Sequence, residues 1–165
     1  WVIFGKLFFR LLVSRLLDDV RRRYLNLFGA SIGKGSIVYE SANIWLPQNL
    51  IMGTNSTIGP NVNVYNQGNI TIGDGVVISQ FSELCASSHD YKLDGFPLIL
   101  CPIYINNNSW IASSAFIGPD VVIAENNVIG ARSVVMKSTE KNFVYHGNPA
   151  KIISSLVLLK EKSDR

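Results

Sequence analysis

Histidine and cysteine are scarce in this chain, and their scarcity excludes several kinds of site. Of the 165 residues only His89 and His146 are histidines, so a zinc site with three histidine ligands cannot be built within one chain. The two cysteines, Cys85 and Cys101, lack the C-x-x-C spacing of zinc ligands and redox pairs. We therefore expect both to be reduced thiols that fill the core as small hydrophobic side chains.

Charge is also sparse, at 16% of the residues, and it is unevenly distributed. Residues 1–29 hold six basic and two acidic residues, a net charge of +4, and the other nine basic and ten acidic residues give −1. A general nucleic-acid surface is therefore not indicated. Lys6, Arg10 and Arg15 interrupt every window of about 18 apolar residues, which argues against a membrane span. No small-residue cleavage site follows a clean apolar core, so we expect no signal peptide.

Residues 1–29 instead have the pattern of a basic amphipathic helix that ends at Gly29. A polar stripe recurs every four residues: Lys6, Arg10, Ser14 and Asp18. Large apolar residues surround this stripe: Phe4, Leu7, Phe8, Leu11, Leu12 and Leu16. Two interpretations follow from this pattern. The helix packs on its own domain or on a sister subunit, or it lies on an anionic membrane surface.

From Ile32 onward an aliphatic residue recurs at every sixth position. The longest run is Ile105, Ile111, Ile117, Ile123, Ile129 and Val135. The same step connects Ile72, Ile78 and Leu84, then Ile58, Val64 and Ile70, then Ile32, Val38 and Ile44. Neither a helix of 3.6 residues per turn nor the two-residue alternation of a strand produces this period. A coil with three flat faces and tight corners does, so the sequence predicts a parallel β-helix of stacked short strands.

The six-residue period stops once, at the segment "CASSHDYKLDGFPLILCP", residues 85–102, and it resumes at Ile103. A regular coil fills its own interior, whereas a loop that leaves the coil carries side chains on a rigid scaffold. We therefore expect an extruded loop within residues 85–104. This loop contains His89, and an imidazole with an unperturbed pKa near 6.5 is well suited to act as a general base.

Four motifs give the chain a resemblance to a known family. "SHDY", "PIYINNNSWI", "IGARSVVMK" and "GNPAK" occur in that order. With the six-residue repeats of residues 30–153, they resemble the left-handed β-helix acyltransferases, in particular the acetyltransferases of colanic acid biosynthesis and the galactoside and maltose O-acetyltransferases. The resemblance implies an all-β, left-handed parallel β-helix with acetyl-coenzyme A as co-substrate and no required metal. The expected organisation is a helical segment over 1–29, the β-helix over 30–145, and a C-terminal turn and short helix over 146–165.

The resemblance also implies roles for individual residues. His89 matches the catalytic base, and Ser113 matches the position whose backbone N–H faces the thioester oxygen. Trp110 matches the aromatic residue beside the pantetheine arm, although it could equally bridge two coils. Ala131, Lys137 and Lys151 match contacts to coenzyme A, and the alternative for the two lysines is ordinary solvated surface.

The acceptor side is less well marked in the sequence. Asn63 and Asn66 lie in the region that helps to bind the acceptor in sugar acetyltransferases. Asp90 either orients His89 or holds a sugar hydroxyl. The family's usual homotrimer would form its active sites between subunits. We expect a cytoplasmic sugar O-acetyltransferase of surface polysaccharide or lipid-linked glycan synthesis, with peripheral contact to the inner face of the membrane. The alternatives are an amino-sugar N-acetyltransferase, a different acyl donor, or a non-catalytic scaffold.

Overall fold

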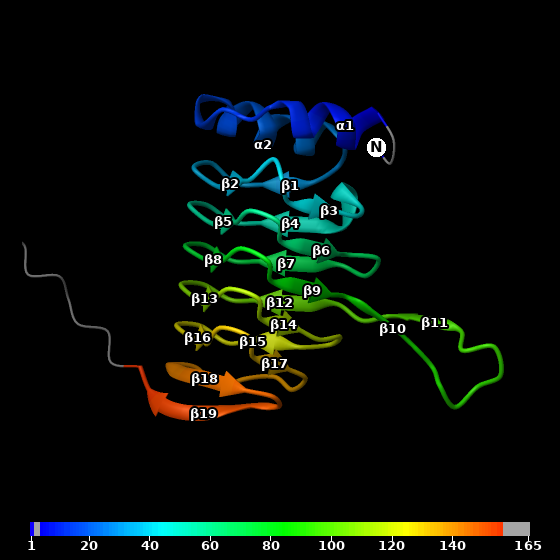
Figure 1. The fold of residues 1–165 in the computed structure, drawn as a ribbon, viewed down its shortest axis with the longest axis vertical. Helices are drawn as coiled ribbons and strands as arrows, with labels where there is room; N and C mark the ends of the chain where they lie inside the picture. Colours follow the sequence, from blue (N-terminus) through cyan, green and yellow to red (C-terminus); the bar gives the residue numbers. More distant parts are fainter. Residues whose placement is uncertain (2–3, 157–165) are drawn as a thin grey trace, which may run out of the picture.

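The protein is a column of stacked coils with a helical layer at one end and an arm on one side (Figure 1). The computed structural model describes residue 1 and residues 4–156, apart from the side chain of Arg15. Three parallel sheets run along the column, and we call them faces A, B and C in the order in which each coil visits them. The predicted parallel β-helix is therefore confirmed.

The strands are short, and each face collects one strand per coil. Face A consists of β1 (Ser31–Ile32), β4 (Leu50–Met52), β7 (Ile70–Ile72), β12 (Ile103–Ile105) and β15 (Val122–Ile123). Face B consists of β2 (Ile37–Val38), β5 (Thr57–Ile58), β8 (Val77–Ile78), β13 (Trp110–Ile111), β16 (Val128–Ile129), β18 (Phe143–Gly147) and β19 (Ala150–Ser155). Face C consists of β3 (Asn43–Ile44), β6 (Asn63–Tyr65), β9 (Glu83–Cys85), β14 (Phe116–Ile117) and β17 (Val134–Val135).

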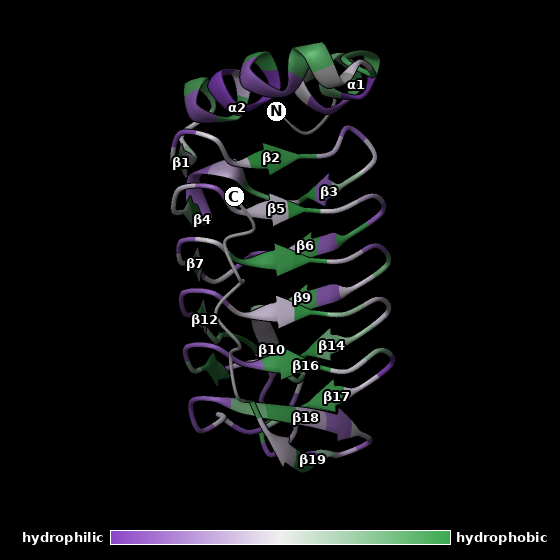
Figure 2. Ribbon diagram, turned by 90° about the vertical axis from the view of Figure 1, so that its left-hand side faces the viewer, coloured by the Kyte–Doolittle hydropathy of each residue, from purple (hydrophilic) through white to green (hydrophobic). Residues whose placement is uncertain are grey.

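The interior is built from the aliphatic residues of the six-residue period, as predicted. Each of them is buried, from Ile32 through Ile78 to Val135. The side chains stack from coil to coil, because Ile58 pairs with Ile78, and Ile78 with Ile111. Figure 2 shows the hydrophobic residues recurring along the column. Burial of about 2 kcal/mol per aliphatic side chain is the main stabilising contribution of such a stack.

Coil length changes along the column, and the change locates the arm. Ile72 of β7 pairs with Ile105 of β12, 33 positions later, whereas Ile105 pairs with Ile123, only 18 positions later. The extra residues leave the column between faces C and A. They form an antiparallel hairpin of β10 (Ser87–His89) and β11 (Leu98–Leu100), which we call the arm. The expected loop is therefore a paired hairpin, and its ends at Cys85 and residues 103–104 belong to strands of the column.

The N-terminal segment is two helices rather than one continuous helix. α1 (Phe4–Leu11) and α2 (Asp18–Leu27) are joined by a break that contains the 3-10 turn η1 (Arg15–Leu17). Together they form the cap, which covers the open end of the first coil (Figure 1). Phe9 and Leu25 point into the core, and Arg21 is almost fully buried. Its Nε donates to the carbonyl of Val38 at 2.8 Å. The break allows both helices to lie across the coil end, so the expected packing on the domain itself is confirmed.

The other end of the column is closed by strands. Residues 150–155, where we predicted part of a C-terminal turn and helix, form a strand instead. β18 and β19 form an antiparallel hairpin, and β18 pairs with the last strand of face B, β16. His146, expected in a turn, lies in β18 opposite Lys151. A hairpin satisfies the backbone groups that β16 would otherwise leave open at the sheet edge. Residues 157–165 of the predicted helix lie outside the described residues.

Candidate active site

His89 is the last residue of β10, on the arm, and its side chain is exposed. The arm holds the ring in one orientation, because Nδ1 lies 2.5 Å from the carbonyl oxygen of Phe96. A carbonyl only accepts hydrogen bonds, so Nδ1 carries the proton. The other ring nitrogen, Nε2, then has a free lone pair. This tautomer is the one that a general base requires.

Asp90 does not contact the His89 ring, although it follows His89 directly. Its Oδ1 accepts the backbone N–H of Lys92 at 3.0 Å, which stabilises the turn at the tip of the arm. Its own N–H donates to the carbonyl of Pro97 at 2.9 Å. Of the two roles predicted for Asp90, orientation of the imidazole is thus taken by Phe96.

Three of the predicted residues lie together in a notch at the corner between faces B and C. Trp110, Ser113 and Ala131 line this notch of about 400 Å³ together with Ser79 and Gln80. The indole Nε1 of Trp110 donates to Ser79 Oγ at 2.9 Å, which fixes the ring against the preceding coil. The interpretation of Trp110 as a bridge between two coils is therefore confirmed, and it is compatible with a role beside a ligand.

The backbone N–H of Ser113 is available in this notch. Its neighbours are bonded, since Ala112 N–H donates to Ile129 and Ser114 N–H donates to Gln80. Among the described residues the N–H of Ser113 has no hydrogen-bond acceptor. An unpaired backbone donor in a partly covered notch is the element from which an oxyanion hole is built.

Lys137 and Lys151 come together in a second cleft, at the closed end of the column. The cleft has a volume of about 440 Å³ and is also lined by Met136, Tyr145 and Ala150. Both lysine side chains are exposed. The structure therefore groups the predicted donor-site residues into two neighbourhoods, one aromatic and small, the other basic.

The arm and the notch lie at different corners of one chain. The notch is at the corner before face C, and the arm leaves at the corner after it. Strand β9 lies between Gln80 and Ala86, and its three residues span roughly 10 Å. Figure 1 shows the arm extending away from the side of the column that carries β8 and β13. Within one chain, His89 is thus directed away from Ser113.

The two predicted acceptor residues differ in accessibility. Asn63 is half-buried and belongs to a polar ladder on face C, where it accepts from Asn43 at 2.9 Å and donates to Glu83 at 3.1 Å. Asn66 is fully buried, and its amide bonds both the N–H and the carbonyl of Leu46. The prediction for Asn66 is corrected, because an amide whose donor and acceptor are already paired inside the column cannot reach a sugar.

The sequence analysis missed Ser79 and Phe96, which hold Trp110 and His89 in place. The position of Ser79 at the corner before face C, equivalent to Ala112 one coil later, could have indicated the first. No local sequence feature indicates Phe96, because its backbone carbonyl, and not its side chain, contacts His89.

The cysteines lie at the base of the arm and are free thiols. Cys101 is buried, and burial is the main reason that its pKa is raised above the usual value. Cys85 is only half-buried, contrary to expectation, and its thiol contacts the carbonyl of Ser87 at 3.4 Å. Cys101, whose thiol ionises less readily than usual, is therefore a poor nucleophile. No group of three or more metal-ligating side chains occurs among the described residues.

Comparison with known proteins identifies the family of this chain. Residues 102–137 match the family model "Bacterial transferase hexapeptide (six repeats)". The chain is 44% identical over 133 residues to the "Putative colanic acid biosynthesis acetyltransferase WcaF" of Escherichia coli (strain K12), covering 81% of this chain and 73% of that protein. The chain belongs to the hexapeptide-repeat acetyltransferases.

Two further members of this family are also similar. The galactoside O-acetyltransferase of Escherichia coli (strain K12) is 31% identical over 131 residues, which are 77% of this chain and 64% of that protein. The hexapeptide-repeat acetyltransferase VCA0836 of Vibrio cholerae superposes with a TM-score of 0.82 at 26% identity, over 92% of this chain and 89% of that chain. VCA0836 has also been solved in complex with acetyl coenzyme A.

Proposed function

We propose that this hexapeptide-repeat acetyltransferase transfers acetyl from acetyl-coenzyme A to a sugar hydroxyl, in the synthesis of a surface polysaccharide or a lipid-linked glycan. His89 is the general base. The observation that carries the proposal is the contact of His89 Nδ1 with the carbonyl of Phe96, which leaves Nε2 free to accept a proton. The names of the relatives, which include a galactoside O-acetyltransferase, support a sugar as acceptor.

In the proposed reaction, Nε2 of His89 takes the hydroxyl proton while the hydroxyl oxygen attacks the thioester carbonyl carbon. The backbone N–H of Ser113 stabilises the oxyanion that forms, typically by about 3 kcal/mol for one such donor. The carbon–sulfur bond then breaks, and the imidazolium returns the proton to the thiolate. The products are the acetyl ester and coenzyme A, so no acyl-enzyme is needed and neither cysteine takes part.

The donor site fits the residues of the notch and of the basic cleft. The small residues Ser79 and Ala131 leave room beside Trp110 for a thin chain such as pantetheine. Lys137 and Lys151 supply positive charge for phosphates. These are the residues that would hold acetyl-coenzyme A.

A second copy of the chain is part of the proposal, because one chain does not bring its own arm to its own notch. The arm also exposes large apolar residues that a neighbouring subunit would cover: Leu93, Phe96, Leu98, Ile99 and Leu100. A closed ring of three subunits, with each arm reaching the notch of the next, satisfies both requirements. The proposed location is the inner face of the membrane, with the cap in peripheral contact.

The test is acetyl transfer by the purified protein, followed as thiol release from acetyl-coenzyme A with panels of sugar alcohols and amino sugars. We expect release with sugar alcohols, and His89→Ala should lower kcat by a factor of about 10² or more. The matched control is His146→Ala. His146 is the other histidine and is also exposed. Its side chain lines neither the notch nor the basic cleft, so kcat should stay within about twofold.

Three outcomes would contradict the proposal. Unchanged turnover by His89→Ala would remove the base. Transfer only to amino sugars would indicate an N-acetyltransferase. The absence of thiol release with every acceptor would favour a non-catalytic scaffold.

A further inference from the structure

The outer side of the cap exposes an unusual number of large apolar side chains. We call them the outer cap residues: Phe4, Leu7, Phe8, Leu11, Val13, Leu16, Val20 and Leu27. Leu16 is 92% exposed, Phe4 83% and Leu27 80%. On α1 these residues follow the spacing i, i+3, i+4, i+7, so they form one continuous stripe. The buried residues of α1, Gly5 and Phe9, lie on a different side of the helix.

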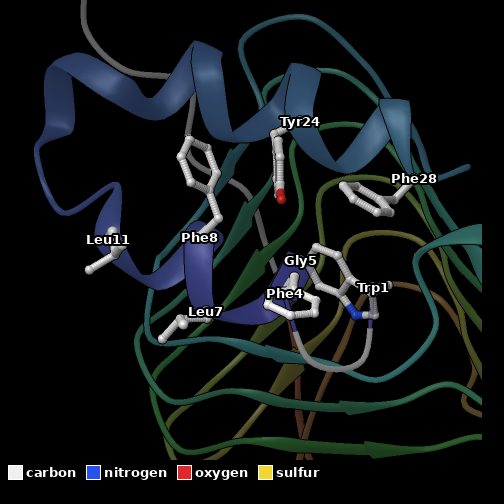
Figure 3. Close-up of a pocket in the computed structure, with 8 residues that line it drawn as sticks. All are labelled: Trp1, Phe4, Gly5, Leu7, Phe8, Leu11, Tyr24 and Phe28. Carbon is white, nitrogen blue, oxygen red and sulfur yellow. The ribbon is translucent and has the colours of Figure 1, made fainter.

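Between the two helices this surface opens into an apolar cleft of about 550 Å³. Figure 3 shows Tyr24 of α2 and Phe28, which follows the end of α2, on one side and the stripe of α1 on the other, with Trp1 at the end of the cleft. The aromatic rings are packed, with centroids 5.1 Å apart for Phe8 and Tyr24 and 5.2 Å apart for Trp1 and Phe28. The cleft is therefore a formed feature of the cap, and most of its lining is apolar.

Positive charge accompanies this apolar surface. Residues 1–29 carry a net charge of +4. Arg10 is exposed, and the side chain of Arg23 is 75% exposed beside Asp19. Lys6 is directed inward, where its Nζ donates to Asn43 at 3.1 Å and lies over the ring of Trp45. The cap thus combines an exposed apolar stripe with arginines at its edge.

We propose that the outer cap residues dock onto an anionic phospholipid bilayer and that the column stands upright on the membrane. Apolar area and basic charge together are what the interface of an anionic membrane binds. A second copy of the chain fits this surface less well, because cap-to-cap pairing would bring the exposed arginines of two caps, Arg10 and Arg23, toward one another. None of the helices in the described part of the chain is long and apolar enough to cross a bilayer, so the contact is peripheral.

This orientation sets the height of the proposed active site. The arm follows β9, which is the third strand of the face C stack β3, β6, β9. Strands lie about 4.8 Å apart, so the third coil is roughly 10 Å below the first. The helical layer adds about 10 Å. An upright column therefore holds His89 about 20 Å from the membrane interface. Resting on the proposed function, this height favours a lipid-linked glycan of several sugars over a single sugar on a lipid.

The first test is co-sedimentation with vesicles of phosphatidylglycerol and phosphatidylcholine. We expect binding that weakens as the phosphatidylglycerol fraction falls or as salt rises. Leu11→Ser should weaken binding about fivefold, and Leu7→Ser/Leu11→Ser at least about tenfold. The matched control is Ile153→Ser, since Ile153 is 63% exposed and Leu11 67%, but Ile153 lies at the opposite end of the column. Circular dichroism verifies that the variants are folded.

Two variants that each remove one positive charge complete this test. Arg10→Gln should weaken binding about fivefold, while Arg132→Gln, at an exposed corner of a later coil, should leave it unchanged. Absence of binding to anionic vesicles at low salt overturns the proposal. Equal losses in the cap and control variants also overturn it. Light scattering without vesicles measures the oligomeric state. If Leu7→Ser/Leu11→Ser dissociated an oligomer in that measurement, the surface would be assigned to contact with a second copy of the chain instead.

The second test measures orientation by fluorescence quenching with brominated phospholipids. A Trp45→Phe/Trp110→Phe variant retains Trp1 in the cap, and a Trp1→Phe/Trp45→Phe variant retains Trp110 in the fourth strand of face B from the cap. We expect strong quenching of Trp1 and none of Trp110. Equal quenching of both would overturn the upright orientation.

Acceptor length tests the height separately. Long lipid-linked glycans in vesicles should be acetylated much faster than a single lipid-linked sugar. Equal rates would overturn the height while leaving the proposed function intact. The absence of transfer to any free sugar would count against the proposed function alone.

Discussion

Arg21 and Arg22 are neighbours on α2 that form similar ion pairs in very different surroundings. Arg21 pairs with Asp18 and Arg22 with Asp19, both at the i,i+3 spacing. The side chains of the first pair are 2% and 23% exposed, and those of the second pair are 15% and 58% exposed. Arg21 also donates to the carbonyls of Val38, Leu12 and Ser14, which ties α2 and the break between the helices to the first coil.

Arg21→Met is predicted to destabilise the cap by about 3 kcal/mol. Removing one partner of a fully buried ion pair costs about 3–5 kcal/mol, and the lower end applies because Asp18 keeps some contact with water. The carbonyl of Val38 also loses its buried donor, which adds to the cost. The control Arg22→Met should cost no more than about 1 kcal/mol, because its partner Asp19 is 58% exposed and keeps Arg23 as a second partner.

The assay is amide hydrogen exchange of the helices, read by mass spectrometry, because the cap can open locally while the coils stay folded. A loss of about 3 kcal/mol corresponds to exchange that is faster by roughly 10² for the amides of α2. Arg22→Met should change the same amides by less than about tenfold. If both variants accelerated exchange equally, burial would not be what makes Arg21 important, and the reasoning would fail.

Two further predictions concern the column. Ile111 lies in the fully buried stack between Ile78 and Ile129, so Ile111→Ala should lower the free energy of unfolding by about 2–5 kcal/mol, measured by urea titration. Val77→Ala on the outer side should cost less than about 1 kcal/mol. Similar costs for the two variants would contradict the stacked-core account. The N–H and hydroxyl of Thr54 both donate to Asp74, which lowers the pKa of that carboxyl. A lowered folded-state pKa stabilises the protein above the unfolded value, and this stability is lost as pH falls through the folded pKa. Asp74→Asn should therefore be less stable than wild type near neutral pH and equal to it in acid; a difference independent of pH would contradict this.

The core of the fold could be predicted from the sequence because each hexapeptide meets the same structural requirement. One residue in six must point inward on every flat face, and the aliphatic run from Ile105 to Val135 records this directly. The position of the arm was equally visible, because an expelled segment cannot keep the period. Its form was not, since the pairing of Ser87 with Leu100 joins residues that share no periodic pattern.

The candidate site could be predicted only in part. His89, Trp110 and Ser113 stand out by their motifs, whereas Ser79 lies outside these motifs and Phe96 acts through its backbone carbonyl. Asn66 illustrates the opposite error. An asparagine at a corner has a side chain that could bind a ligand. Only the tertiary structure shows that the amide of Asn66 is already paired with the backbone of Leu46.

The two ends of the column show which features follow from the sequence and which depend on the tertiary structure. The sequence alone determined the six-residue period, the amphipathic character of residues 1–29, and the presence of a histidine and two cysteines in the segment that interrupts the period. These features depend only on which residues are close to one another along the chain. The tertiary structure alone decided that the N-terminal segment breaks into two helices and that strands close the other end. Those outcomes depend on which backbone edges and apolar surfaces the stacked coils leave uncovered, and that is known only once the coils are assembled.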